Sequence, residues 1–213
     1  MNPFVPIFMV AGAACGLLAD RIAARWPDHE YDPIRPIDWR TFVVITFGAL
    51  AIGAIPDRFG DAPELVLFGA VFATLILMMA TDLDQRLLPD KLTLPLVGLG
   101  IAMLAWGGNP LVEKNPTWLV IVGAIAVPLV LVIISRPFGE AAIGGGDIKL
   151  LVGIGLLAGV ERLVSALLVG AILGGVVIGV LVLTRRVTLK DYVPFGPFLI
   201  IGVAWALLAP AGL

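Results

Sequence analysis

Charged residues are scarce in this chain of 213 residues, at 14% against 60% hydrophobic residues. A soluble domain has roughly a quarter charged residues, so a mean hydropathy of +1.05 excludes an ordinary soluble protein. The net charge of −2 is too small to indicate a nucleic-acid-binding surface. The composition therefore predicts an integral membrane protein whose surroundings are the lipid bilayer, with no nucleic acid as a partner.

Cysteine and histidine are almost absent, because Cys15 and His29 are the only residues of their kind. A single cysteine excludes an internal disulfide and a zinc site built from cysteines. Cys15 stands among small apolar residues, where packing is its expected role. His29 stands in a polar loop, so we expect no metal site.

Eight apolar segments fill the chain, each long enough or nearly long enough to cross about 30 Å of hydrocarbon as a helix. The second, fourth and sixth of them are short. The expected fold is all-α, a polytopic membrane protein with about eight transmembrane helices. The segments are Pro3–Ala19, Thr41–Ile55, Pro63–Thr81, Leu92–Trp106, Thr117–Ser135, Ile148–Gly159, Leu163–Thr184 and Pro194–Leu208.

Basic residues are distributed unevenly among the loops that join these segments. Of the 14 basic residues, 11 lie in the loops after the first, third, fifth and seventh segments or, like Lys149, within two residues of such a loop. Only Arg58, Lys114 and Arg162 lie on the opposite side. Loops rich in Lys and Arg stay in the cytoplasm. The expected localisation is the cytoplasmic (inner) membrane, with both termini on the extracytoplasmic side.

Three consecutive glycines precede an aspartate where a loop gives way to an apolar segment. Glycine allows close backbone approaches, and a carboxylate at a helix start accepts hydrogen bonds from free N–H groups. In a soluble protein this pattern would be a flexible turn with an acidic cap. Between apolar segments, however, an ionisable residue is costly and is a functional candidate. We therefore expect Gly144, Gly145 and Gly146 to form a loop that positions Asp147.

A second acidic group, which includes Asp82, ends the third apolar segment. The predicted orientation places Asp82 and Asp147 at the same cytoplasmic boundary, where they meet if their helices pack together. Two neighbouring carboxylates share one proton near neutral pH. The ionised one can activate a water for attack on a peptide carbonyl, while the protonated one donates to the carbonyl oxygen. This chemistry needs no metal and no organic cofactor.

Three further charged residues near these aspartates are expected to have other roles. Asp84 is expected in a loop with Arg86, where it would be solvated or face a substrate. Asp90 follows Pro89 and directly precedes the fourth segment, a position typical of a structural helix cap. Lys149 is a second residue that could face a substrate.

Three stretches of the chain resemble, in the same order, the motifs of the type IV prepilin peptidases. They are Asp82-Leu83-Asp84-Gln85-Arg86-Leu87-Leu88-Pro89-Asp90, then Gly144-Gly145-Gly146-Asp147-Ile148-Lys149-Leu150 with its GxGD motif, and Val193-Pro194-Phe195-Gly196-Pro197-Phe198. The resemblance implies an intramembrane aspartic endopeptidase whose catalytic pair is Asp82 and Asp147. It also implies prepilin or pseudopilin substrates, cut on the cytoplasmic side after a short basic leader.

The first third of the chain departs from the pattern of that family. Its bifunctional members carry a large cytosolic loop with two CxxC pairs, whereas the loop from Asp20 to Arg40 is short and lacks cysteine. We therefore expect a peptidase without N-methylation activity. The expected organisation is residues 1–81 as N-terminal helices with the cytosolic loop 20–40, and residues 82–213 as the peptidase core, within a single membrane-embedded domain.

Two other functions fit parts of the same pattern. Presenilin-like and signal-peptide-peptidase-like proteases share GxGD, but their first aspartate follows a tyrosine where this chain has Thr81. A proton-coupled membrane transporter could use Asp82 and Asp147 as an ion path, although both are expected at one membrane face rather than at the midplane. No particular pilin, secretion system or oligomeric state is predicted.

Overall fold

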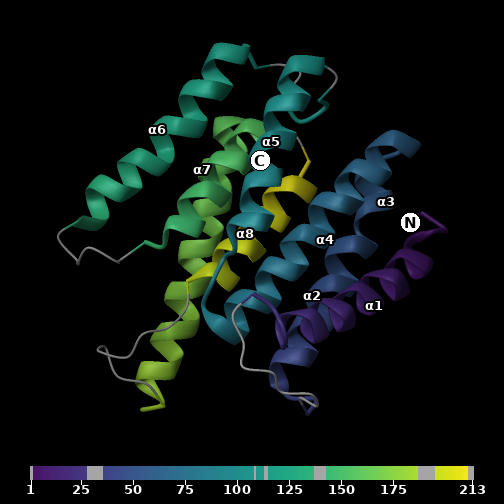
Figure 1. Ribbon diagram of the computed structural model, residues 1–213, viewed down its shortest axis with the longest axis vertical. Coiled ribbons are helices and arrows are strands. Elements are labelled where there is room, and N and C mark those ends of the chain that lie inside the picture. The colour runs from purple at the N-terminus through teal and green to yellow at the C-terminus, as the bar shows by residue number, and fades with distance from the viewer. Residues whose placement is uncertain are drawn as a thin grey trace. The chain divides into compact units, whose positions relative to one another are not determined.

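The computed structural model describes residues 2–27, 36–107, 109–112, 115–136, 143–186 and 195–210. Within these ranges the regular secondary structure is entirely helical, which confirms the expected all-α fold (Figure 1). The helices are α1 (Val5–Ala23), α2 (Trp39–Gly53), α3 (Ile55–Arg58), α4 (Ala62–Gln85), α5 (Asp90–Trp106), α6 (Thr117–Ser135), α7 (Gly145–Leu183) and α8 (Gly196–Leu208). His29 and residues 28–35 of the predicted cytosolic loop lie outside the described residues.

Several helices are long and apolar enough to cross a membrane. Within the described residues there are five such stretches, and α8 is a shorter apolar helix. The stretches are Val5–Ala23, Trp39–Arg58, Ala62–Gln85, Thr117–Ser135 and Gly145–Leu183. The chain is thus a multi-pass membrane protein, while the number of eight crossings and the position of both termini remain predictions.

The chain divides into two compact units, Met1–Pro89 with Leu208–Leu213, and Asp90–Leu207. The first unit contains Asp82 and the second contains Asp147. The expected organisation, residues 1–81 and residues 82–213 within a single membrane-embedded domain, remains a prediction. The two units are described one at a time below.

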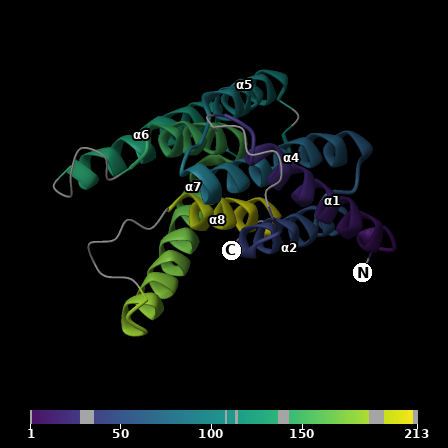
Figure 2. The ribbon, with the colours of Figure 1, turned by 60° about the horizontal axis from the view of Figure 1, so that its bottom comes forward.

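Helices α1, α2 and α4 pack against one another in the first unit (Figure 2). The closest approach is between α1 and α2 and depends on glycines of both helices. A Cβ atom on Gly12 would lie 2.1 Å from the carbonyl oxygen of Gly48, and one on Gly16 would lie 2.6 Å from that of Val44. Any side chain at these positions would separate the two backbones. Small residues that allow such contact are the usual means of joining helices in lipid.

Helix α7 of the second unit is interrupted at Gly159, where φ is +82° and ψ is 169°. A Cβ atom on Gly155 would lie 3.0 Å from a methyl group of Leu163, eight residues later. Eight residues of continuous helix would span about 12 Å, so the chain turns back on itself at the break (Figure 2). Glycine is favoured here because the positive φ suits no other residue well. The element α7 therefore covers the predicted segment Ile148–Gly159 and, except for its last residue, the predicted segment Leu163–Thr184.

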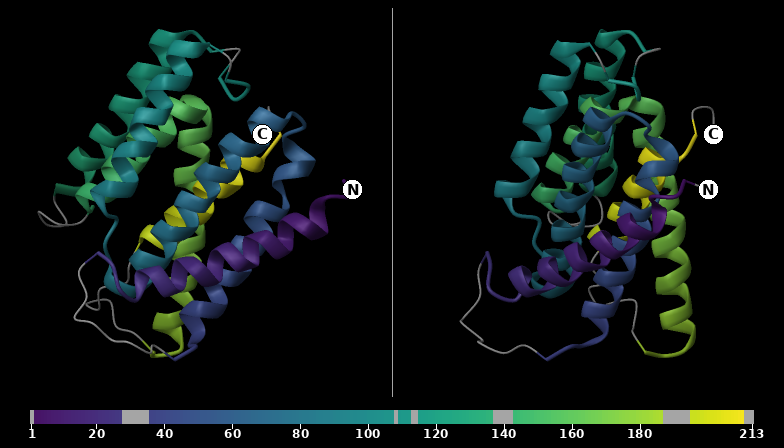
Figure 3. Two further views of the ribbon diagram at one scale, coloured as in Figure 1. Left: turned by 45° about the vertical axis from the view of Figure 1, so that its right-hand side comes forward. Right: turned by 90° about the vertical axis from the view of Figure 1, so that its right-hand side faces the viewer.

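The two arms of α7 have different neighbours within the second unit. Helices α5 and α6 pack on the arm before the break, where Gly100 faces Gly153 and Ala124 faces Gly155. The arm after the break contacts α8, since a Cβ atom on Gly202 would lie 2.1 Å from the carbonyl oxygen of Ala166 (Figure 3). The N-terminal arm, which carries Asp147, is thus fixed by two helices.

The break in α7 frees backbone groups that a continuous helix would pair. The buried side chain of Asn109 donates from Nδ2 to the carbonyl oxygen of Leu157 at 2.6 Å, two residues before Gly159. An unpaired carbonyl in an apolar interior costs several kcal/mol, on the order of 2–7. Asn109 therefore stabilises the reversal of the chain.

Candidate active site

Asp82 lies in the last turn of α4 and is 6% exposed. Its backbone carbonyl accepts a hydrogen bond from the N–H of Arg86 at 2.9 Å, and Arg86 ends the helix in the left-handed conformation. Thr81, which is fully buried, donates its hydroxyl hydrogen to the carbonyl of Met78 at 3.0 Å. These two hydrogen bonds fix the backbone of α4 on either side of Asp82.

Asp84 lies within α4, so the expectation of a loop position with a solvated side chain is wrong. The helix continues to Gln85, and the Asp84 side chain is only 5% exposed. Its Oδ1 accepts a hydrogen bond from the Arg40 guanidinium at 2.5 Å. This ion pair neutralises a buried carboxylate two residues from Asp82, and it allows the helix to extend past the apolar segment. The proposed substrate-facing role of Asp84 remains a prediction.

Arg40 has no functional role in the sequence-based prediction, which counts it only as a cytosolic charge. It stands in the first turn of α2, where the carboxylate of Asp38 caps the helix and lies 3.6 Å from the Arg40 Nε. Arg40 thereby connects the start of α2 to the end of α4. No local pattern reveals this contact, because Arg40 and Asp84 are 44 residues apart.

The end of α1 is joined to the same region by two further contacts. Gln85 donates from Nε2 to the carbonyl oxygens of Ala23 and Trp26, at 2.8 and 3.1 Å. Thr41 donates its hydroxyl to Asp20 at 3.0 Å, and Asp20 is 2% exposed. We refer to the residues that join the ends of α1, α2 and α4 as the polar cluster. They are Asp20, Arg40, Thr41, Asp84 and Gln85.

Asp147 occupies the third position of α7 and caps the helix from within. Gly144 precedes the helix in an extended conformation, and its N–H donates to the Asp147 Oδ2 at 3.3 Å. The other oxygen, Oδ1, is buried and has no hydrogen-bond partner among the described residues. A carboxylate at this end is also favoured by the helix dipole. Asp147 therefore has one anchored oxygen and one oxygen that is available for a proton or a partner.

The three glycines before Asp147 do not all form a loop, which corrects the expectation. Gly145 and Gly146 belong to the first turn of α7, and only Gly144 lies outside it. A Cβ atom on Gly144 would lie 3.2 Å from the Asp147 Oδ2, whereas one on Gly145 would meet nothing within 4 Å. The space beside the carboxylate is therefore a requirement at Gly144 in particular.

Asp90 and Lys149 form an ion pair within the second unit. The Lys149 Nζ lies 2.5 Å from the Asp90 Oδ1, and the two side chains are 40% and 58% exposed. Asp90 is the first residue of α5, so the predicted helix-start position is correct to within one residue, but its carboxylate pairs with Lys149. The last residue of the first motif thus contacts a residue two positions after Asp147. A substrate-facing role for Lys149 remains a prediction.

The third motif lies at the start of α8. Gly196 and Pro197 are buried, and Phe198 contacts Gly170 and Gly174 of α7. Val193 and Pro194 fall outside the described residues. Within the described part of the chain, no three His, Cys, Asp or Glu side chains gather where they could hold a metal ion.

Comparison with known proteins connects this arrangement to one family. The model of the type IV leader peptidase family matches residues 65–179, more than half of the chain, and includes both Asp82 and Asp147. No solved structure matches significantly.

Curated relatives agree with the family match. The chain is 36% identical over 169 residues to the "Prepilin leader peptidase/N-methyltransferase" of Burkholderia pseudomallei (strain K96243), covering 78% of this chain and 53% of the relative. Proteins of the same name from Aeromonas hydrophila and Stutzerimonas stutzeri are 35% and 33% identical, over 69% and 63% of this chain and 51% and 46% of the relatives. The chain spans about half the length of these relatives. It belongs to the type IV leader peptidase family.

Proposed function

We propose that this chain is an aspartic endopeptidase that cleaves the basic leader from type IV prepilins or pseudopilins at the cytoplasmic face of the inner membrane. The proposed catalytic pair is Asp82 and Asp147. The observation that carries the proposal is the state of Asp147, whose buried Oδ1 has no hydrogen-bond partner among the described residues. A buried carboxylate oxygen without a partner requires a proton or a second polar group. A second carboxyl group that shares one proton would satisfy that requirement.

In the proposed mechanism, the pair supplies one base and one acid. The ionised carboxylate removes a proton from a water molecule, whose oxygen attacks the scissile carbonyl carbon. The protonated carboxyl group donates its proton to the carbonyl oxygen, so that a neutral tetrahedral intermediate forms. As the C–N bond breaks, the carboxyl group that is now protonated donates its proton to the leaving amine. The other carboxylate removes a proton from a hydroxyl group of the intermediate, so the pair remains singly protonated.

The anchoring of the two aspartates supports this assignment. Asp82 follows directly on a buried stretch of α4, and two residues of the polar cluster, Asp84 and Gln85, follow it in the same helix. Asp147 is held through its Oδ2 by the N–H of Gly144. The ion pair of Asp90 and Lys149 places the last residue of the first motif beside a residue of the second motif, within the second unit. A catalytic carboxylate must be held in place in this way, because small displacements reduce rates strongly.

We propose further that the chain does not methylate the product. The relatives above are named for both a peptidase and an N-methyltransferase activity. The segment from Asp20 to Arg40 has no cysteine and too few apolar residues to fold a domain of its own. It therefore lacks thiolates that could bind zinc and stabilise a small unit at that position.

The test is incubation of the purified chain in detergent with a prepilin-like peptide that has a basic leader, a glycine at the cleavage site and an apolar segment. The expected result is cleavage after the glycine, detected by mass spectrometry. Labelled S-adenosylmethionine is added to a parallel reaction, and the mature N-terminus is expected to remain unlabelled. Folded protein that leaves the peptide intact would contradict the peptidase assignment, and label on the product would contradict the absence of methylation.

A further inference from the structure

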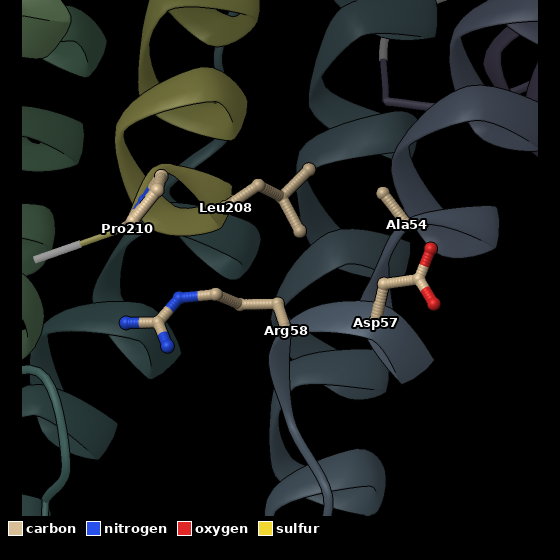
Figure 4. A pocket seen from close by; sticks show the side chains of 5 residues that line it. All are labelled: Ala54, Asp57, Arg58, Leu208 and Pro210. Carbon is tan, nitrogen blue, oxygen red and sulfur yellow. The ribbon is translucent and has the colours of Figure 1, made fainter. Parts of the chain in front are cut away.

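A cavity of about 350 Å³ lies in the first unit, far along the chain from the aspartate motifs. Its lining consists of Ala54, Asp57, Arg58, Leu208 and Pro210, all of which belong to the first unit (Figure 4). Three of these residues are apolar. The cavity therefore combines an apolar wall with a cationic group.

Arg58 is the group in this cavity that lacks a counter-charge. Its guanidinium extends toward Pro210, and its Nε is buried without a hydrogen-bond partner (Figure 4). It forms no ion pair and no side-chain hydrogen bond within the described residues. Such a cation is expensive to bury unless an anion or other acceptors accompany it.

The aromatic neighbour of Arg58 fixes its position but does not replace an anion. The guanidinium carbon lies 5.3 Å from the centre of the Phe59 ring, which is stacked on Phe68 at 3.8 Å. A cation–π contact engages the face of the guanidinium and leaves its N–H groups free for acceptors in the plane. Phe59 thus orients the guanidinium so that the N–H groups of Arg58 can donate hydrogen bonds into the cavity.

The nearest acid, Asp57, is already engaged elsewhere. Its carboxylate accepts a hydrogen bond from the backbone N–H of Asn2 at 2.8 Å. In Figure 4 it points away from the Arg58 guanidinium. The acceptor for Arg58 must therefore come from outside the described residues, and a guanidinium fork fits a phosphate with two parallel hydrogen bonds.

The depth of Arg58 indicates which source of phosphate the cavity is suited to. It is the last residue of the candidate membrane span Trp39–Arg58, which places it at the level of the lipid headgroups. Asp82 lies about 30 Å farther along α4 from Ala62, so this cavity is at the opposite end of that helix. Anionic phospholipids combine a phosphate at this depth with apolar tails.

We propose that this cavity binds an anionic phospholipid. The Arg58 guanidinium holds the lipid phosphate, and the glycerol and upper acyl chain lie against Ala54, Leu208 and Pro210. The free phosphate ion shares the chemistry of the headgroup but offers nothing to the apolar wall. A zwitterionic lipid adds an ammonium group, for which the lining offers only Asp57, whose carboxylate points away from the Arg58 guanidinium (Figure 4).

The test uses the full chain, purified in a neutral detergent and examined by native mass spectrometry. Phosphatidylglycerol, phosphatidylcholine and inorganic phosphate are titrated separately. One molecule of phosphatidylglycerol is expected to remain bound to the wild-type chain, at least about tenfold more tightly than phosphatidylcholine. Arg58→Gln should weaken this binding by at least about tenfold, because a charge-assisted bidentate contact is lost.

Two matched variants complete the experiment. Arg25→Gln removes an exposed charge of the same unit and is expected to bind phosphatidylglycerol like the wild type. Arg58→Lys keeps the positive charge but lacks the two parallel donors of the guanidinium, so it is expected to bind phosphatidylglycerol several-fold more weakly than the wild type. If Arg58→Gln does not fold, the binding measured for Arg58→Lys serves as the test. Equal binding by wild type and both Arg58 variants would overturn the site. Binding of inorganic phosphate as tight as that of the lipid would overturn the assignment to a lipid.

Discussion

The two aspartates of the proposed catalytic pair are held by different means. Asp82 is at the C-terminal end of α4, and the side chains of the polar cluster fix the surrounding helix ends. Asp147 is at the N-terminal end of α7, and a single backbone N–H from Gly144 anchors its carboxylate. One position thus depends on charges far apart in the sequence, and the other depends on the absence of side chains nearby.

This difference has a practical consequence for mutagenesis. The surroundings of Asp82 should respond to changes of charge in other helices, because ion pairs there are largely buried. The surroundings of Asp147 should respond to changes of size next to it, because glycine leaves room for the carboxylate. Four experiments test this contrast, from the largest expected effect to the smallest.

Removal of either carboxylate should have the largest effect. Asp82→Asn and Asp147→Asn should each lower the cleavage rate by at least about 1,000-fold, because the mechanism needs one ionised and one protonated carboxyl group. The double variant should be little worse, since residues that act as a unit are not additive. The measurement is single-turnover cleavage of a prepilin-like peptide by variants that fold normally.

The exposed cap residue Asp61 supplies the control for the carboxylate variants. Asp61 lies at the start of α4, at the other end of this helix from Asp82, and Asp61→Asn should cleave at the wild-type rate. Asp84→Asn should retain a substantial fraction of activity. If Asp84→Asn is inactive and Asp82→Asn cleaves normally, the catalytic residue of the first motif is Asp84.

Removal of the guanidinium partner of Asp84 should have the next largest effect. Arg40→Ala leaves a carboxylate that is 5% exposed without this partner, so the free energy of unfolding should fall by about 1–3 kcal/mol. Arg40→Ala combined with Asp84→Ala should recover part of the loss, since no lone charge is then left behind. Thermal unfolding in detergent measures both, with the exposed Arg25→Ala as the control. Strictly additive losses would show that the two residues are not coupled.

A small change of size next to Asp147 should reduce activity moderately. Gly144→Ala would place a Cβ atom 3.2 Å from the Asp147 Oδ2, so that the carboxylate must shift by a few tenths of an ångström. The expected result is about a three- to tenfold lower cleavage rate with little change in stability. Gly145→Ala meets open space and should stay within about twofold of wild type. Similar rates for the two alanine variants would refute a role for space at Gly144.

The exposed ion pair between Lys149 and Asp90 should contribute least to the free energy of unfolding. Lys149→Ala removes a partner of Asp90 in a pair whose side chains are 40% and 58% exposed. Solvent and salt screen such pairs, so unfolding should become easier by about 0.2–1 kcal/mol at most. Thermal unfolding at low and high salt measures the effect, which should disappear at high salt. A loss as large as that of Arg40→Ala would mean that burial does not distinguish the two pairs.

Much of this architecture could be predicted from the sequence, because the apolar segments have few charges and end at polar residues. The placement of Asp147 near a helix start follows from the glycines before it. The position of Asp84 could not be predicted, since its carboxylate pairs with Arg40, 44 residues earlier in the chain. Asp20 was missed for the same reason, as its partner Thr41 is on another helix. Contacts between distant segments leave no local pattern.

The length of α4 has a consequence for the membrane around it. Its 24 residues span about 36 Å, which exceeds a hydrocarbon core of about 30 Å, and Asp82 lies three residues from its end. A helix that is too long for its bilayer tilts or thickens the lipid nearby. A bilayer of longer acyl chains would draw the carboxylate into hydrocarbon, whereas shorter chains would leave it in contact with water. Through this hydrophobic mismatch, the acyl-chain length of the host membrane sets how much water reaches Asp82.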